Sequence, residues 1–223
     1  MPDTALPDSG FLGQASPALK RVLSEKTTEI ALAPGRILFE QGQMGDALFA
    51  ILDGALEFSI LSGDGRKLAL DIMGPGAVFG EIAFFDPGPR TATVTAIRAT
   101  RVCRLRHADL LIALGDNPDL GADLLRLAGQ RMRWMGQQLT EQVFLPLPGR
   151  LARKLLHLAA EDAGDEPIPL SQAELAEFVG ATREAVSKTL AGWKRAGVIG
   201  AGRGGVTILD RAALAALADP DRF

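Results

Sequence analysis

A short segment of this chain, residues 79–92, combines a carboxylate, a guanidinium and a hydroxyl among glycines. It reads Phe-Gly-Glu-Ile-Ala-Phe-Phe-Asp-Pro-Gly-Pro-Arg-Thr-Ala. The carboxylate of Glu81 can accept hydrogen bonds from sugar hydroxyls, and the planar guanidinium of Arg90 can bind two phosphate oxygens. Backbone N–H groups near Gly80 and the hydroxyl of Thr91 can complete an anion-binding cradle. This combination predicts a site for a ribose phosphate.

The same segment resembles the phosphate-binding cassette of the CRP/FNR regulators, the family of the cyclic-AMP receptor protein. In that family the glutamate holds the ribose 2′-hydroxyl and the arginine holds the cyclic phosphate. The alternative is a Pro/Gly loop with a surface arginine. A strand-like run at residues 77–79 and an alternating strand at residues 91–97 flank the loop and favour the cassette. The resemblance implies that the effector-binding residues are Gly80, Glu81, Ile82, Ala83, Arg90 and Thr91.

Composition limits the class of protein that could carry this site. The 223 residues suffice for one large domain or two modest ones, and 47% of them are hydrophobic, which is ample for a packed core. No apolar run approaches the roughly 20 residues that cross a bilayer, and no signal peptide is visible. The single cysteine, Cys103, excludes an intrachain disulfide and suits a reducing compartment. We therefore expect a cytoplasmic protein that does not bind membranes.

Metal and haem chemistry receive little support from the sequence. One cysteine cannot supply the four thiolates of an iron–sulfur cluster, which excludes the oxygen-sensing branch of the family. His107 and His157 are too few for a several-histidine metal centre, so an enzyme on a jelly roll, such as a cupin, is disfavoured. Pro2 is only a weak match to the haem-ligand position of a carbon-monoxide-sensing relative. We expect no catalytic residues, no metal site and no tightly bound cofactor.

Short β-like runs separated by glycines fill residues 30–105, after a short helix that starts at Ser16-Pro17. Many short strands at this spacing predict an antiparallel sandwich, jelly roll or barrel. The predicted fold class is α+β. An N-terminal segment, residues 1–16, precedes an antiparallel β-roll at residues 17–116, which is jelly-roll-like and resembles a cyclic-nucleotide-binding domain.

A long helix is expected over residues 117–143, beginning at Asn117-Pro118. Its apolar and small residues alternate by four and three, as in the seam of a coiled coil. The alternative is one amphipathic helix that lies on the chain's own β-domain. Leu127 and Trp134, which are off the seam, could make that contact while the seam meets a second subunit, so we favour a parallel homodimer. The predicted dimer interface consists of Leu125, Ala128, Met132, Met135 and Leu139.

Prolines follow this helix and a second domain follows the prolines. Residues 144–149 contain two prolines that are expected to break the helix twice, which predicts a hinge at Phe144, Leu145 and Pro146. Residues 150–223 are expected to form a winged helix-turn-helix domain. In it, a capping box at residues 171–174 opens one helix, and a short glycine turn separates this helix from a second, capped by Thr182. A hairpin at residues 198–209 forms the wing.

The second helix is expected to enter the major groove of double-stranded DNA with its N-terminal turn at the base edges. By resemblance to the family, Glu184 accepts a hydrogen bond from a cytosine amine, while Arg183 and Lys188 donate to guanine. Residues 183–203 carry five basic side chains and one acidic side chain, a local net charge of +4 in a chain of net charge −3. Phosphate contact requires such a local excess. The predicted DNA-binding residues are Ser171, Gln172, Thr182, Arg183, Glu184, Ser187, Lys188 and Arg203.

These patterns predict a homodimeric transcription regulator that binds a palindromic operator under allosteric control by a small ligand, with RNA polymerase as a further partner. Cyclic AMP is the first candidate effector. In the cyclic-AMP receptor protein, however, a Thr-Ser pair on the long helix contacts adenine, and Met135 and Gly136 occupy those positions here. Neither side chain can hydrogen-bond a base. Cyclic GMP, a cyclic dinucleotide such as cyclic di-GMP, and a vestigial pocket with constitutive DNA binding therefore stay open. A nucleotide-sensing module without DNA binding is less favoured.

Overall fold

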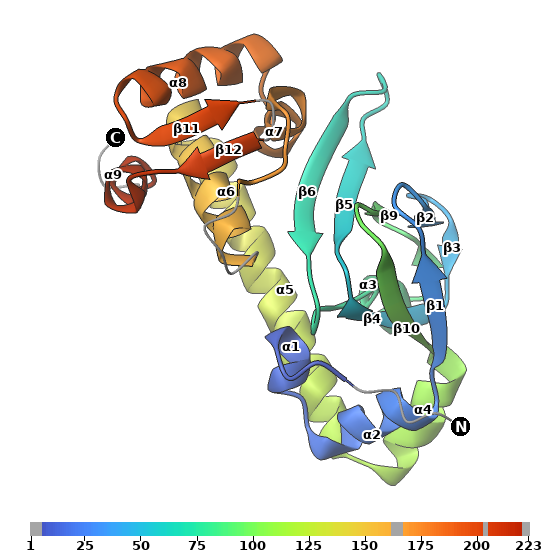
Figure 1. Cartoon of the computed structure of the whole chain (residues 1–223). Coiled ribbons are helices and arrows are strands. Elements are labelled where there is room, and N and C mark those ends of the chain that lie inside the picture. Colours follow the sequence, from blue (N-terminus) through green and yellow to red (C-terminus); the bar gives the residue numbers. More distant parts are fainter. Residues whose placement is uncertain (1–5, 162–166, 203–204, 220–223) are drawn as a thin grey trace. The chain divides into compact units, whose positions relative to one another are not determined.

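The computed structural model describes residues 6–161, 167–202 and 205–219 (Figure 1). Pro2, Arg203 and nearly all of the acidic loop before Pro167 lie outside these ranges. The described chain forms two compact units. The first comprises the described residues up to Ile60 together with Asp71–Trp134, and the second comprises Leu61–Leu70 together with the described residues from Met135 onward.

Two four-stranded sheets carry most of the strands between residues 28 and 106. The order in the first is β1 (Thr28–Leu32), β10 (Thr100–Arg106), β4 (Ala47–Asp53) and β7 (Val78–Phe79). The order in the second is β2 (Ile37–Phe39), β9 (Thr93–Ala96), β5 (Leu56–Leu61) and β6 (Lys67–Met73). A short antiparallel ribbon pairs β3 (Met44–Gly45) with β8 (Gly88–Pro89). The antiparallel β-roll expected from the glycine-punctuated runs is therefore present, although β9 begins at Thr93 and not at Thr91.

Four phenylalanine rings join the two sheets. Phe49 and Phe79 come from the first sheet, and their rings stack with centroids 5.3 Å apart. Phe39 and Phe58 come from the second sheet, and Phe58 meets Phe79 edge-on at 5.0 Å. Such offset and edge-on ring pairs are favourable in addition to the apolar area that they bury. Because Phe79 directly precedes Gly80, this cluster fixes the start of the predicted cassette.

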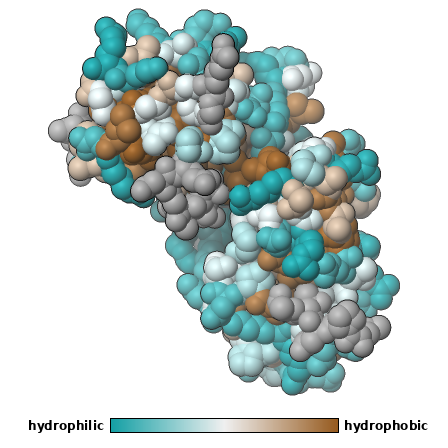
Figure 2. All heavy atoms as spheres, in the orientation of Figure 1, coloured by the Kyte–Doolittle hydropathy of each residue, from teal (hydrophilic) through white to brown (hydrophobic). Residues whose placement is uncertain are grey.

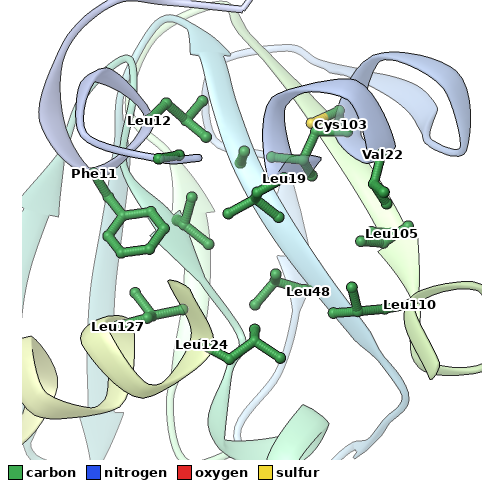
Figure 3. Packing of buried hydrophobic residues seen from close by; sticks show 14 of the residues in the cluster. Phe11, Leu12, Leu19, Val22, Leu48, Cys103, Leu105, Leu110, Leu124 and Leu127 are labelled. Atoms are coloured by element: carbon green, nitrogen blue, oxygen red, sulfur yellow. The ribbon is translucent and has the colours of Figure 1, made fainter. Parts of the chain in front are cut away.

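Helices cover the other face of the first sheet. They are α1 (Gly10–Gly13), α2 (Pro17–Glu25), α4 (His107–Asp116) and the first half of α5 (Asp119–Phe144). Figure 3 shows Phe11 of the N-terminal segment beside Leu124 and Leu127 of α5, and Leu12 belongs to the same buried cluster. The start of α2 is as expected, since the Ser16 hydroxyl accepts a hydrogen bond from the Leu19 N–H at 3.1 Å. Neither α1 nor α4 was expected.

The helix after α5 begins almost at once. α6 spans Leu147–Glu161, so only Leu145 and Pro146 separate it from α5. The expectation that prolines break the helix twice is wrong, because Pro148 lies in the first turn of α6. Proline is tolerated there, since first-turn N–H groups have no intrahelical acceptor. The hinge at Phe144, Leu145 and Pro146 stays a prediction.

The second unit contains the expected helix-turn-helix and wing. α7 (Gln172–Val179) ends at Gly180, whose φ of 60° places it in the left-handed region that favours glycine. α8 (Arg183–Arg195) follows, then the antiparallel strands β11 (Ile199–Gly202) and β12 (Gly205–Ile208), and finally α9 (Arg211–Leu217). The Lys194 ammonium donates to the Ala201 carbonyl at 2.7 Å, which ties α8 to the wing. None of the helices in the described ranges is long and apolar enough to span a membrane.

The buried Cys103 generates a prediction about stability and pH. Burial raises the pKa of its thiol from 9.0 to about 11. Between these values the unfolded chain loses a proton that the folded chain keeps, so the free energy of unfolding should fall as the pH rises, by at most about 1.4 kcal/mol per pH unit. Below this window Cys103 contributes no slope.

Urea unfolding across the window measures the slope, with Cys103→Ala as the control. The chain has no tyrosine, so lysines are the other side chains that ionise there. The variant should show a shallower fall in unfolding free energy than the wild type. Equal slopes would contradict the assignment of the raised pKa to burial of this thiol.

Candidate functional site

The predicted cassette lies between β7 and β8 and turns sharply at Gly80. The φ of Gly80 is +84°, and a Cβ atom there would lie 2.9 Å from both the Ala47 carbonyl oxygen and an Arg90 nitrogen. Glycine is therefore required for the turn and for the close approach of Arg90. Glu81 follows as the N-cap of the short helix α3 (Ile82–Phe85). The fold thus brings Gly80, Glu81 and Arg90 together, as the sequence predicted.

The Glu81 carboxylate is buried and has an arginine as its partner. Its Oε1 accepts a hydrogen bond from Nε of Arg131 at 3.1 Å. Arg131 lies on α5 and also donates to the Val78 carbonyl at 3.3 Å. Sequence reasoning did not include Arg131 in the site. The available signal was weak, a basic residue off the apolar seam of a long helix.

Arg90 is a buried cation, and only 7% of its surface is exposed. Its terminal nitrogens donate to the carbonyls of Ala47 at 3.1 Å and Gly80 at 3.3 Å. Within residues 6–161, 167–202 and 205–219 no carboxylate oxygen forms an ion pair with it. Burial lowers the pKa of the guanidinium, and the charge of Asp46 opposes that shift. A buried cation that has carbonyl partners but no ion-pair partner attracts an anion strongly.

The remaining cassette residues are arranged around this cation. Ala83 is buried, whereas Ile82 and Thr91 are exposed. The N–H groups of Ile82 and Ala83 lie in the first turn of α3, where no preceding turn supplies an acceptor. They could therefore donate to a bound anion, as the resemblance implied. Their contact with an effector stays a prediction.

Met135 and Gly136 belong to the second compact unit, whereas the cassette belongs to the first. Met135 is exposed, and no atom of the described chain lies near the position of a Cβ on Gly136. Neither side chain carries a hydrogen-bond donor that could read a base edge. Their role at the base end of an effector stays a prediction.

α5 carries two separate apolar faces. Leu120, Leu124 and Leu127 are buried against the β-roll, as expected for Leu127. Trp134 is half-buried, and the Arg131 guanidinium lies 5.8 Å from its ring centre. The seam residues Leu125, Met132, Met135 and Leu139 are each more than half exposed, and Ala128 is half-buried. Figure 2 shows hydrophilic and apolar side chains intermixed on the face that it draws. An exposed apolar row such as this seam marks a surface for association.

The starts of α7 and α8 are both capped by hydroxyls. The Ser171 hydroxyl accepts from the Glu174 N–H at 3.2 Å, and the Glu174 carboxylate accepts from the Ser171 N–H at 2.7 Å, which completes the expected capping box. The Thr182 hydroxyl accepts from the Ala185 N–H at 3.2 Å. Each hydroxyl keeps its own proton, which it can donate to a DNA phosphate.

The outer face of α8 presents the predicted base-reading residues. Arg183, Glu184 and Lys188 are exposed, and Ser187 is half-buried. On the opposite face Val186, Leu190 and Trp193 are buried. Among the described residues neither Arg183 nor Lys188 has an ion-pair partner. Gln172 is half-buried at the start of α7, and Arg203 lies outside the described residues. The exposed face is therefore open for contacts with DNA.

Comparisons with known proteins agree with both halves of this picture. Residues 29–117 match the family model of the cyclic nucleotide-binding domain, and residues 149–217 match that of the Crp-like helix-turn-helix domain. The chain is 34% identical over 203 residues to the CRP-like cAMP-activated global transcriptional regulator of Mycobacterium tuberculosis, covering 88% of this chain and 91% of that protein. The chain belongs to the CRP/FNR family.

Other members of the CRP/FNR family support the assignment. The cyclic AMP receptor protein of Thermus thermophilus is 31% identical over 187 residues, which cover 82% of this chain and 85% of that protein. The crystal structure of a CRP/FNR-family transcriptional regulator from Thermus thermophilus matches with a TM-score of 0.75 and 26% identity, covering 86% of this chain and 98% of that chain. The predicted family and fold are confirmed. The protein is a DNA-binding transcription regulator with a cyclic nucleotide-binding domain.

Proposed function

We propose that this CRP/FNR regulator is a homodimer that binds a palindromic operator when a cyclic nucleotide occupies its cassette. Cyclic AMP is the first candidate, because the similar regulators named above are described as cAMP-activated or as a cyclic AMP receptor. The observation that carries the proposal is the buried guanidinium of Arg90, which has no carboxylate partner among the described residues. The protein acts by binding and not by catalysis, and RNA polymerase is its expected partner at promoters.

The charges at the cassette suit a cyclic phosphate. At the cassette the guanidinium groups of Arg90 and Arg131 accompany the carboxylate of Glu81. Asp46 also acts on Arg90, but its charge is paired with that of Arg104. A phosphodiester carries one negative charge, which would neutralise the excess positive charge. Since Arg131 occupies Oε1 of Glu81, Oε2 is the oxygen best able to accept from the ribose 2′-hydroxyl.

The base end of the effector is less constrained than the phosphate end. Met135 and Gly136 offer apolar contact and space in place of hydrogen bonds. Cyclic GMP or cyclic di-GMP could therefore replace cyclic AMP, and a cassette without a physiological ligand would leave DNA binding constitutive. A panel of these nucleotides distinguishes the alternatives.

The apolar seam of α5 is proposed to pair with the same seam of a second chain. The exposed side chains of Leu125, Met132 and Leu139 would then leave water, which stabilises association roughly in proportion to the apolar area buried. A parallel pair would place two copies of α8 about 34 Å apart, one turn of DNA. Such a dimer reads a palindrome because its own symmetry is twofold.

Named contacts lead from the effector site along the chain to the DNA-binding helices. Arg131 of α5 donates a hydrogen bond to Glu81, so an effector that binds Glu81 would alter a contact made by α5. Beyond the last turn of α5, Arg150 donates to the Leu145 carbonyl at 2.9 Å and to the Val179 carbonyl at 3.2 Å. The predicted hinge at Phe144, Leu145 and Pro146 is therefore held to the end of α7 by one side chain. A change in the pose of α5 on effector binding would reach the recognition helix through these contacts.

Removing the guanidinium of Arg90 tests the effector part of the proposal. Arg90→Ala should weaken cyclic AMP binding by about thirtyfold or more, because loss of one member of a buried, hydrogen-bonded charge pair costs about 2–5 kcal/mol. Calorimetry with a panel of cyclic mononucleotides and dinucleotides measures the affinity.

Arg36→Ala is the matched control, because Arg36 is exposed in the first compact unit. This variant should bind like the wild type. Tight binding of any cyclic nucleotide that survives Arg90→Ala would overturn the cassette assignment.

Truncation of a base-reading arginine tests the DNA part of the proposal. The probe is a duplex selected by the wild-type protein, with cyclic AMP present, from a randomised pool. Arg183→Ala should weaken binding to this duplex by about 1–3 kcal/mol and relax the sequence preference at one position of each half-site. Gel-shift titration measures both effects. Arg211→Ala, an exposed arginine on α9, should bind normally. Unchanged affinity and preference in Arg183→Ala would exclude α8 as the recognition helix.

A further inference from the structure

Arg90 occupies a slot whose walls come from three strands. Its guanidinium carbon lies 4.3 Å from the ring centre of Phe39 in β2 and 5.3 Å from that of Phe49 in β4. A guanidinium over an aromatic face is attracted by the ring quadrupole, and more strongly when water is excluded. The carbonyls of Ala47 and Gly80 hold two of its N–H groups. Within the described residues its other guanidinium N–H groups have no hydrogen-bond acceptor.

Gly45 of β3 forms the third wall. A Cβ atom at this position would lie 2.6 Å from Cζ and 2.9 Å from Cδ of Arg90, and closer still to Nε. The φ of Gly45 is outside the left-handed region, so its backbone conformation does not demand glycine. What excludes a larger residue is the guanidinium itself. The absence of a side chain at Gly45 thus leaves the space that the Arg90 guanidinium occupies.

The two-stranded ribbon sets the register of this slot. Gly45 pairs with Gly88 and Met44 pairs with Pro89, so Arg90 is the first residue after the paired part of β8. The Arg90 N–H then donates to the Gln43 carbonyl at 2.8 Å, and the Arg90 carbonyl accepts from the Gly42 N–H at 2.8 Å. These bonds fix the backbone of Arg90 beside β3, and the missing side chain of Gly45 leaves room for the guanidinium.

We propose that Gly45, Phe39 and Phe49 are positioning residues that hold the Arg90 guanidinium ready for the effector phosphate. They act through Arg90 and are not assigned any effector contact of their own. Holding a long, flexible side chain in its binding pose removes the entropy loss that binding would otherwise incur, so the slot raises affinity for the phosphate. This inference rests on the proposed function, because it assumes that Arg90 binds a phosphate.

Gly45→Ala is the most direct test. The added methyl group must displace the guanidinium, which is the far end of a flexible side chain, so the fold should tolerate the change. We expect a protein that still folds cooperatively and binds cyclic AMP about tenfold more weakly, the scale of immobilising one flexible side chain. Gly115→Ala is the control, since no atom lies near its Cβ position, and it should bind like the wild type.

A double-mutant cycle separates positioning from general structural damage. If Gly45 acts through Arg90, Gly45→Ala should weaken binding in the wild-type background and have no further effect in Arg90→Ala. Equal effects of Gly45→Ala in both backgrounds would overturn the inference, as would wild-type affinity in the single variant.

Nuclear magnetic resonance of the effector-free protein reports the pose of Arg90 independently of the proposed function. The Nε–H signal of Arg90, assigned by its absence from Arg90→Ala, should be shifted by the ring currents of Phe39 and Phe49, and Gly45→Ala should reduce the shift. An identical signal in Gly45→Ala would contradict the slot. If the wild type binds no cyclic nucleotide while Gly45→Ala changes the signal, the proposed function fails and the slot stands.

Discussion

The β-roll of this CRP/FNR regulator is organised around a buried positive charge. Arg90 is held by two aromatic faces and two backbone carbonyls, and no described carboxylate oxygen forms an ion pair with it. A Cβ atom at position 45 or 80 would meet its side chain in the present pose. The phenylalanine cluster that joins the two sheets supplies the surfaces on which it rests. An anion bound beside Arg90 would pair with this buried positive charge and offset the cost of burying it.

Glu81 connects the cassette to α5 through an ion pair. Its carboxylate is buried and paired with Arg131, and breaking such a pair leaves a buried charge uncompensated. An effector that uses Glu81 must therefore share it with α5. The same helix carries the exposed apolar seam and ends where Arg150 holds the segment before α6. In the proposed function, effector recognition, dimerisation and DNA binding therefore all involve this one helix.

Local patterns were sufficient to predict the features that depend on neighbouring residues. The capping box at Ser171, the glycine turn at Gly180 and the end of a strand at Gly80 each follow from a few residues in sequence. α1 escaped prediction because its four residues are too few for helical periodicity. The contact of Arg131 with Glu81 and the slot around Arg90 could not be predicted from the sequence. They join residues that are far apart in the chain and that only the tertiary fold brings together. The prediction of a second helix break was wrong because proline breaks a helix in its interior, whereas Pro148 lies in the first turn of α6.

In the proposed function, occupation of the cassette and binding of the operator are coupled. Calorimetric titration of cyclic AMP into the free protein and into its complex with the selected duplex tests this coupling most directly. We expect one effector per chain, two chains per duplex, and tighter effector binding in the complex by the same factor by which cyclic AMP tightens DNA binding. Equal effector affinity with and without DNA, in a protein that binds both, would show that the two sites are not coupled.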